Sequence, residues 1–355
     1  MAFHTIGLPS GNIEIYLENG ILSSIGSIAA QKVTGRTAVI VSDSNVAPLY
    51  GEAVQNSLKE SGFNTSVSVI QAGEKSKNIN TVNMLFDDFY KASLSRFDVV
   101  ILLGGGVTGD TGGFAAASYM RGISYIQVPT SLLAQIDSSI GGKTGVDLPY
   151  GKNLVGAFYQ PLAIVIDPAV LITLPELYLA DGMAEAVKYG CIRDYSIFES
   201  IEKGLTKGEM TQMIKKCVLI KAKIVENDEH DFGERMLLNF GHTFGHAIER
   251  CTDYSVFTHG QAVSIGMIIA AKIGEELGVT PKSTAESLKN VLTNCGLPVE
   301  FQINAELLFS AIMADKKREN NIINFILLNE IGNAIIHKIK PDELRAVYER
   351  ANLNG

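Results

Sequence analysis

Three histidines and one glutamate form the densest group of potential metal ligands in the sequence. His242, His246 and His259 lie within eighteen residues, although the chain of 355 residues has only six histidines. His242 and His246 are four residues apart and would share one face of a helix, and Glu185 lies in a predicted helix at 183–189. Two imidazoles and one carboxylate leave coordination positions open, as in catalytic zinc sites. We expect a catalytic metal; the spacing leaves open which histidine is not a ligand.

A glycine-rich run predicts a phosphate-binding loop. Residues 104–110, GGGVTGD, follow an apolar strand at 99–103 and precede a small-residue helix expected at 111–120. The spacing is G-x-G-x-x-G between a strand and a helix, where backbone N–H groups can approach a pyrophosphate. The run departs from the dinucleotide-binding fingerprint, because it does not follow the first strand and the next strand ends at Thr130, not at an acid. A plain tight turn is the alternative interpretation.

The elements that carry this run alternate between strands and helices. Between residue 37 and about residue 167, short β-branched runs predict strands at 37–43, 64–70, 98–103, 124–130 and 162–168. Residues 51–61 and 80–94 have apolar residues at three- and four-residue spacing, as crossover helices have. This alternation is typical of a parallel α/β sheet with right-handed connections.

The second half of the chain has a different texture. Residues 209–228, 234–251 and 260–277 predict helices without intervening strands, and runs at 321–329 and 333–340 predict one late hairpin turning near Gly332. Because a chain of this length usually forms more than one core, we expect two domains. The boundary is placed near Val170, giving an α/β domain at 1–170 and a mainly α-helical domain at 171–355.

Composition and charge exclude several classes of protein. The net charge of −8 and the lack of any Lys/Arg block argue against nucleic acid or a membrane surface as partner. Four scattered cysteines, the absence of a signal-like start and the lack of a membrane-length apolar run lead us to expect a cytoplasmic enzyme. Gly142-Lys143-Thr144 is similar to the end of a P-loop, but Asp137 stands where that motif begins with glycine. A nucleoside triphosphatase is therefore disfavoured.

Longer motifs resemble those of one enzyme family, the 3-dehydroquinate synthases. The resemblance runs nearly unbroken from Gly104 to about Gly266. It rests on GGGVTGD, on SYMRGISYIQVPTSLLAQIDSSIGGKTGVDLPYGKNLVGAFYQP, on GMAEAVKYG, on LLNFGHTFGHAIE and on HGQAVSIGM, in the family's order. Weaker matches, GEKSK from Gly73 and DKK from Asp315, extend it over most of the chain.

The resemblance implies an N-terminal NAD-binding Rossmann-like domain, a helical C-terminal metal-binding domain, an active site in the cleft between them, and a homodimer. It implies zinc or cobalt bound by Glu185, His242 and His259. His246 would then contact the substrate or support the ligands. It also implies that a seven-carbon sugar acid phosphate is oxidised transiently by NAD, loses phosphate, is reduced again and closes to a ring by an aldol step.

Matching by motif extends the implied sites to two sets of residues. Groups that hold the substrate's carboxylate, hydroxyls and phosphate would be Arg121, Asp137, Lys143, Lys152, Asn153, Lys188, Lys221, Arg235 and Asn239. Groups that bind NAD would be Asp43, Asn45, Glu74, Lys77, Gly105, Gly106, Asp110, Thr130, Ser131, Lys143, Lys152, Thr173 and Leu174. Asp43 supplies the strand-end acid that the glycine run lacks, and it would accept hydrogen bonds from a ribose.

Departures from the family pattern limit these implied sites. Ser131 stands where the family commonly has threonine, and Asp147 where it commonly has asparagine. Lys316 and Lys317 are left out of the expected site, because the stretch after them lacks the glycine that the family pattern has. The rival functions are another sugar phosphate cyclase, such as 2-deoxy-scyllo-inosose synthase, a metal-dependent glycerol or alcohol dehydrogenase, and a non-catalytic binding protein. The lysine-rich segments argue against the dehydrogenases, and the intact motifs against a binding protein.

Overall fold

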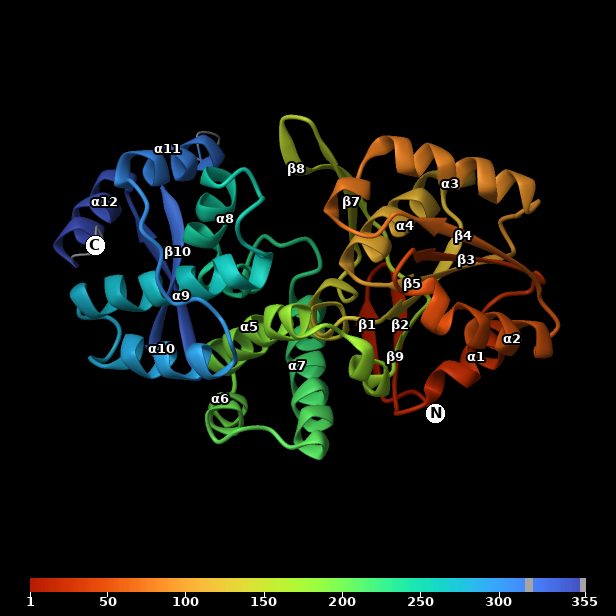
Figure 1. Ribbon diagram of the computed structural model, residues 1–355, viewed down its shortest axis with the longest axis horizontal. Coiled ribbons are helices and arrows are strands. Elements are labelled where there is room, and N and C mark those ends of the chain that lie inside the picture. Colours follow the sequence, from red (N-terminus) through yellow and green to blue (C-terminus); the bar gives the residue numbers. More distant parts are fainter. Residues whose placement is uncertain (317–321, 352–355) are drawn as a thin grey trace. The chain divides into compact units, whose positions relative to one another are not determined.

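The computed structural model describes residues 1–316 and 322–351, and the chain divides into two compact units (Figure 1). The first unit comprises Met1–Pro175 and Lys221–His230, and the second comprises Glu176–Ile220 and Asp231–Gly355. The predicted boundary near residue 170 assigns Lys221–His230 to the second domain, whereas in the structure these residues belong to the first unit. None of the helices in the described ranges is both long and apolar enough to span a membrane.

A seven-stranded sheet forms the centre of the first unit, in the order β1-β2-β9-β6-β5-β3-β4. Every neighbouring pair is parallel except β1 and β2. The strands are β1 (His4–Leu8), β2 (Gly11–Leu17), β3 (Thr37–Asp43), β4 (Asn64–Ile70), β5 (Val99–Gly104), β6 (Ser124–Pro129) and β9 (Ala163–Ile166). The five strands predicted between residues 37 and 167 are confirmed, as is the Rossmann-like α/β class; β1 and β2 are additional strands.

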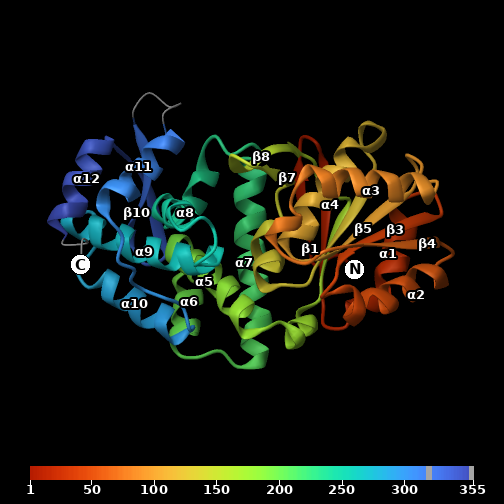
Figure 2. The same ribbon diagram turned by 45° about the horizontal axis from the view of Figure 1, so that its top comes forward.

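Helices cover both faces of this sheet, which explains why the inner strands β3, β5, β6 and β9 are buried along most of their length, whereas the edge strand β4 exposes Val67 and Val69. Along β3, Ile40 packs in a cluster with α1 (Ile25–Lys32) and α2 (Glu52–Glu60), whereas Val39 and Val41 pack with α3 (Ile79–Lys91) and α4 (Gly106–Ser118). Figure 2 shows α1 and α2 on one side of the sheet and α3 and α4 on the other. The short helices of the unit are η1 (Ile21–Ser24), η2 (Ala47–Gly51), η3 (Glu74–Ser76), η4 (Tyr119–Arg121), η5 (Ala134–Ser138) and η6 (Pro168–Thr173).

The glycine-rich run is mostly helical, so the prediction of a loop through residue 110 is wrong. Helix α4 begins at Gly106 and ends at Ser118. Glycine is a poor helix former, but close packing overrides that preference here. A Cβ on Gly112 would lie 2.5 Å from the Leu102 side chain, and one on Gly113 would lie 2.6 Å from Thr144. Only residues without a side chain let α4 approach the sheet so closely.

A hairpin that the sequence reasoning did not predict follows β6. Strands β7 (Lys143–Leu148) and β8 (Gly151–Phe158) pair antiparallel and form a two-stranded sheet of their own. In Figure 1 this hairpin stands apart from the central sheet of its unit. It carries three of the predicted site residues, Lys143, Lys152 and Asn153.

The second unit is mainly helical, as predicted. Its helices are α5 (Glu176–Ile192), α6 (Tyr195–Glu202), the first part of α7 (Lys207–Asn227), η7 (Glu234–Asn239), α8 (His242–Cys251), α9 (His259–Glu276), α10 (Thr284–Asn294), α11 (Ala305–Lys316) and α12 (Pro341–Arg350). The predicted late hairpin is confirmed by β10 (Ile323–Glu330) and β11 (Asn333–Ile339), which pair antiparallel. Helix α9 is buried along most of its length and packs against α5, α8, α10, α12 and β10.

The single helix predicted at 234–251 is wrong, because it is interrupted between η7 and α8. Gly241 has a left-handed backbone, with φ of 80°. A Cβ there would lie 2.5 Å from the Met267 side chain, so any other residue would be strained in both respects. The interruption places His242 at the first position of α8.

Candidate active site

Helix α5 carries three buried ionisable residues on one face. Asp181, Glu185 and Lys188 are spaced by four and three residues, so their side chains follow one another along the helix. Asp181 accepts a hydrogen bond from the backbone N–H of Gly260, which fixes the start of α9 against α5. Glu185 is completely buried, and Lys188 Nζ lies beside its Oε2.

Glycines let α8 and α9 pack closely, and this packing positions two histidines. A Cβ on Gly266 would lie 2.0 Å from the carbonyl oxygen of Gly241, and one on Gly245 would lie 3.1 Å from Cα of Val263. The two helices therefore touch backbone to backbone. His242 begins α8 and His259 begins α9, so the contact brings the two helix starts together.

Glu185, His242 and His259 converge at this point, each offering one ligand atom within 4.8 Å of the others. Nε2 of His242 lies 3.6 Å from Oε1 of Glu185, and Nε2 of His259 lies 3.8 Å from the same oxygen. Nδ1 of His242 lies 3.1 Å from the Phe240 carbonyl oxygen. With its proton on Nδ1, that ring donates to the carbonyl and leaves Nε2 as a ligand atom.

His259 has a carboxylate on each side. Its Nδ1 lies 3.5 Å from Oε2 of Glu249, a buried residue of α8, while its Nε2 faces Glu185. Burial lowers the pKa of His259, but Glu249, and after it Glu185 and Asp181, raise that pKa to about 9 overall. The pKa of His242 is held well below its ordinary value by burial and then by Lys188. Without a metal, His259 is therefore the protonated ring of the pair.

His246 lies one turn after His242 on α8. Its ring centroid is 5.2 Å from that of His242 and 5.8 Å from that of His259. It also belongs to a second possible metal-binding group, with Glu249 and His259. Both groups contain His259. The distances between the side chains, like the spacing in the sequence, therefore leave open which of the other two histidines is not a ligand.

The first group fits a divalent metal. Oε1 of Glu185 is buried and accepts no hydrogen bond from any residue in the described ranges, since Lys188 lies beside Oε2 and the His259 ring is 3.8 Å away. A buried carboxylate oxygen without a hydrogen bond favours a cation bound directly to it. Two imidazole nitrogens and one carboxylate oxygen are ligands that zinc and cobalt both accept. We therefore take Glu185, His242 and His259 as the candidate ligand set.

In the first unit, the predicted NAD-binding residues lie where parallel strands end, except Lys143 and Lys152, which are on the antiparallel β7–β8 hairpin. Because β3, β4, β5, β6 and β9 are all parallel, these ends meet at one edge of the sheet. The segments carry Asp43 at the end of β3 and Asn45 after it, Glu74 and Lys77 after β4, Gly105, Gly106 and Asp110 after β5, Thr130 and Ser131 after β6, and Thr173 and Leu174 after β9. In open α/β sheets this edge is where ligands bind.

The strand order reverses between β3 and β5, and the expected acid and glycine run lie at that switch point. Oδ2 of Asp43 accepts a hydrogen bond of 3.3 Å from Oγ1 of Thr108 in the first turns of α4. Gly105 precedes α4 in an extended conformation and has no side chain to cap it. The N–H groups of the first helical turn are thus available to a pyrophosphate, so this edge fits a dinucleotide.

Lys77 and Asp110, both predicted to contact NAD, form an ion pair. Nζ of Lys77 lies 2.6 Å from Oδ2 of Asp110, and Lys77 is 6% exposed. Burial lowers the pKa of Lys77, but Asp110 and then Glu74 raise it above its ordinary value overall. Lys77 therefore remains charged at this edge of the sheet.

The predicted substrate-binding residues fall into both units. In the first unit, Nζ of Lys221, in the last third of α7, lies 2.7 Å from Oδ1 of Asp137 in η5. Arg121 is exposed after α4 and has a left-handed backbone, with φ of 66°.

In the second unit, Lys188 lies beside the metal-ligand candidates. Arg235 is buried in η7 and Asn239 is exposed at its end. Lys317 and the side chain of Lys316 lie outside the described residues.

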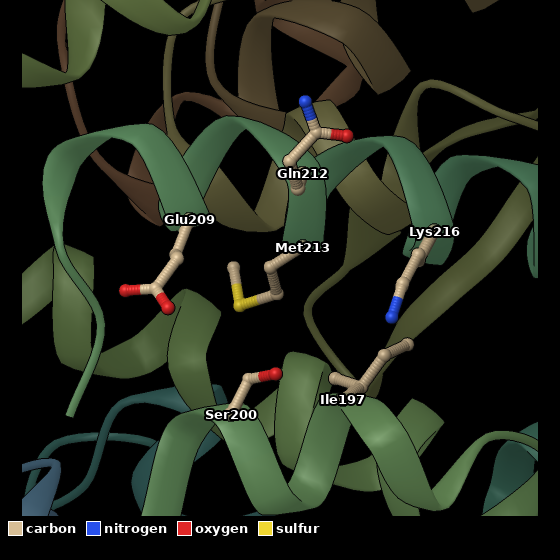
Figure 3. A pocket seen from close by; sticks show the side chains of 6 residues that line it. All are labelled: Ile197, Ser200, Glu209, Gln212, Met213 and Lys216. Atoms are coloured by element: carbon tan, nitrogen blue, oxygen red, sulfur yellow. The ribbon is translucent and has the colours of Figure 1, made fainter. Parts of the chain in front are cut away.

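A pocket elsewhere in the second unit contains none of these residues. It lies between α6 and α7 and is lined by Ile197, Ser200, Glu209, Gln212, Met213 and Lys216 (Figure 3). Its charged groups already have partners, since Lys216 Nζ lies 2.7 Å from Ser196 Oγ and Glu209 accepts hydrogen bonds from Thr206. This pocket is not the candidate active site.

Two positions were missed by sequence reasoning. Asp181 ties α9 to α5, and Glu249 holds His259. Asp181 stands four residues before Glu185, and that helical spacing was the available signal. Glu249 lies within a quoted motif but received no role, because nothing in its spacing shows that it faces a residue of the next helix.

The two units define a protein with a dinucleotide-type sheet edge and a metal-binding helical cluster, and comparisons with known proteins agree. Family models described as 3-dehydroquinate synthase N-terminal and C-terminal match residues 67–181 and 182–318. A 3-dehydroquinate synthase from Clostridium acetobutylicum is 46% identical over 341 residues, which cover 95% of this chain and 96% of that protein. The chain belongs to the 3-dehydroquinate synthase family.

Solved structures of related cyclases share the fold. A 2-deoxy-scyllo-inosose synthase complexed with carbaglucose-6-phosphate, NAD⁺ and Co²⁺ superimposes with a TM-score of 0.86 at 26% identity, covering 98% of this chain and 99% of that one. A 2-epi-5-epi-valiolone synthase from Streptomyces hygroscopicus subsp. jinggangensis with NAD⁺ and Zn²⁺ bound has a TM-score of 0.86 at 25% identity, covering 97% of each chain.

Proposed function

We propose that this chain is a carbon–oxygen lyase that converts 3-deoxy-D-arabino-heptulosonate 7-phosphate to 3-dehydroquinate and phosphate, in the shikimate pathway. Family membership over nearly the whole chain carries this proposal. The reaction comprises a transient oxidation, loss of phosphate, a second reduction and an intramolecular aldol closure. The reduction reverses the oxidation, so the overall conversion is redox-neutral. NAD therefore acts as a cofactor and is not consumed.

The two cofactors would be held in different units of the chain. NAD would bind along the carboxyl edge of the sheet, and zinc or cobalt would bind Glu185, His242 and His259. When bound, NAD supplies a reversible hydride acceptor, and the metal supplies a Lewis acid that makes an alcohol oxygen easier to oxidise. The related cyclases that contain NAD⁺ with Co²⁺ or Zn²⁺ support this assignment.

The chain's own residues would bind and orient a doubly anionic substrate. Fixed cations recognise phosphate and carboxylate strongly where water is excluded. Lys143 and Lys152 are on the β7–β8 hairpin and Lys188 is buried on α5. Asp137 would hold the Lys221 ammonium in place through the ion pair between them. Arg121, Asn153, Arg235, Asn239 and His246 complete the proposed substrate contacts.

A cytoplasmic homodimer is part of the same proposal. None of the four cysteines, all of which lie in the described part of the chain, forms a disulfide, which suits a reducing compartment. The homodimer follows from the family resemblance. Sedimentation of the purified protein tests it, and a monomer at all concentrations would contradict it.

The rival cyclase function is distinguished by substrate. The purified chain, supplied with NAD and zinc, is offered 3-deoxy-D-arabino-heptulosonate 7-phosphate and, separately, glucose 6-phosphate, and phosphate release is measured. We expect release from the first substrate only. Release from glucose 6-phosphate alone would replace this proposal with 2-deoxy-scyllo-inosose synthase.

A further inference from the structure

The β7–β8 hairpin contains an irregularity next to its predicted substrate contacts. Val146 pairs with Val155 and Leu148 pairs with Gly151, so the single residue Asp147 stands opposite the three residues 152–154. Extra residues on one strand form a bulge, which interrupts the ladder and changes the direction of the side chains. Lys152 and Asn153 are therefore presented from a bulge and not from a regular strand.

The carboxylate of Asp147 holds this bulge. Its Oδ1 accepts a hydrogen bond of 2.7 Å from the backbone N–H of Asn153. Asn153 has a left-handed backbone, with φ of 54°, a conformation that asparagine tolerates better than most residues but that still costs free energy. The bond to Asp147 compensates for the ladder partner that the Asn153 amide lacks in the bulge.

Asp147 also joins the hairpin to the NAD-binding segment after β4. Its backbone N–H donates a hydrogen bond of 2.8 Å to the carbonyl oxygen of Lys77, and the neighbouring Asn78 forms an isolated bridge with Asp147. Lys77 is in turn paired with Asp110 of α4. One residue thus connects the Lys152–Asn153 bulge to the ion pair at the sheet edge.

We infer that Asp147 is a positioning residue for the phosphate-binding bulge. It sets the backbone of Asn153, and with it the direction of Lys152, through its role as a hydrogen-bond acceptor. The inference rests on the proposed function only in naming phosphate as the group that the bulge binds. The required property is the acceptor oxygen, which Asp147→Asn retains and Asp147→Ala removes.

Hydrogen exchange of the Asn153 amide tests the contact in the full chain without substrate. We expect exchange in Asp147→Ala to be at least about tenfold faster than in the wild type, since one hydrogen bond to a charged acceptor contributes about that factor or more. Asp147→Asn, whose neutral amide oxygen accepts more weakly than a carboxylate, should exchange more slowly than Asp147→Ala and closer to the wild-type rate. Asp87→Ala, which changes an exposed aspartate of α3 in the same unit, is the matched control and should leave this amide unchanged. Equal exchange in Asp147→Ala and wild type would overturn the inference, as would exchange in Asp147→Asn as fast as in Asp147→Ala.

Kinetics then test whether the contact acts through Lys152. We expect Asp147→Ala to raise the KM for 3-deoxy-D-arabino-heptulosonate 7-phosphate by about tenfold, and Asp147→Asn to restore it to within about twofold. In a Lys152→Ala background, the same Asp147→Ala change should have little further effect. Full additivity of the two changes would overturn the positioning role. If the wild type did not turn over this substrate, the proposed function would fail, while the exchange of the Asn153 amide would still decide the structural role of Asp147.

Discussion

The apparent affinity for metal should depend on pH as expected when binding releases a single proton, and His259 is the residue that releases it. In the metal-free protein the pKa of His259 is raised to about 9 from an ordinary value of 6.5, whereas burial and Lys188 hold His242 neutral. Since a metal ligand must be deprotonated, binding releases the His259 proton at any pH below about 9. The apparent affinity should therefore rise about tenfold for each pH unit up to that value and then level off.

Competition with a chromophoric chelator at several pH values measures this slope. Proton release on adding zinc to a weakly buffered solution provides an independent count. Glu249→Gln removes the carboxylate that contributes most to the raised pKa of His259, so the metal affinity should level off at a lower pH. Glu286→Gln, at an exposed position of α10, is the control and should leave the curve unchanged. An affinity independent of pH below about 9, or the release of two protons, would show that His259 is not the group that titrates on metal binding.

Three further results are expected. Alanine at any of the three proposed ligands should remove both bound metal and turnover, whereas His246→Ala should retain metal and lose turnover. Metal analysis of the purified variants measures this difference. Loss of metal in His246→Ala would favour the second possible metal-binding group, which contains Glu249. Lys152→Ala should cost roughly 2–4 kcal/mol of transition-state stabilisation, measured as the decrease in kcat/KM. The control Lys59→Ala, at an exposed position, should leave kcat/KM unchanged. Near-native turnover of Lys152→Ala would contradict a role in phosphate binding. Gly266→Ala should destabilise the protein by about 1–3 kcal/mol in urea unfolding, because its Cβ would meet the α8 backbone, while the open Gly208→Ala should not; equal stability would mean that the α8–α9 contact relaxes easily.

The repeating strands of the first unit were predictable because each is a short run rich in β-branched residues; β3, β5 and β9 are buried along nearly their whole length, whereas the edge strand β4 is partly exposed. Runs such as 37–43 and 64–70 are bounded by residues that favour turns, and the strands begin and end where these runs do. Strands β1 and β2 were not predicted, although Pro9-Ser10 separates them and Asn19-Gly20 follows β2, which is the same kind of signal. The β7–β8 hairpin was missed because glycines and polar residues occupy it, and its shape depends on side-chain contacts such as that of Asp147.

The limits of sequence reasoning lie where glycine packing decides the geometry. Gly112 and Gly113 act as helix breakers in isolated peptides, yet they are helical here because the neighbouring strands leave no room for a side chain. Gly241 has the opposite role and interrupts a helix that apolar periodicity had predicted to be continuous. Spacing identified the histidines as a group, but the roles of Asp181 and Glu249 depend on contacts between separate helices.

Oxidation, phosphate loss and reduction are proposed to occur within one catalytic cycle. The most direct test supplies the purified, zinc-loaded chain with excess 3-deoxy-D-arabino-heptulosonate 7-phosphate and an amount of NAD much smaller than the substrate. Phosphate, 3-dehydroquinate and NADH are then measured in the same sample. We expect equal amounts of phosphate and 3-dehydroquinate, many equivalents of each per NAD, and no accumulation of NADH. NADH formed in proportion to consumed substrate, or phosphate released without 3-dehydroquinate, would contradict it.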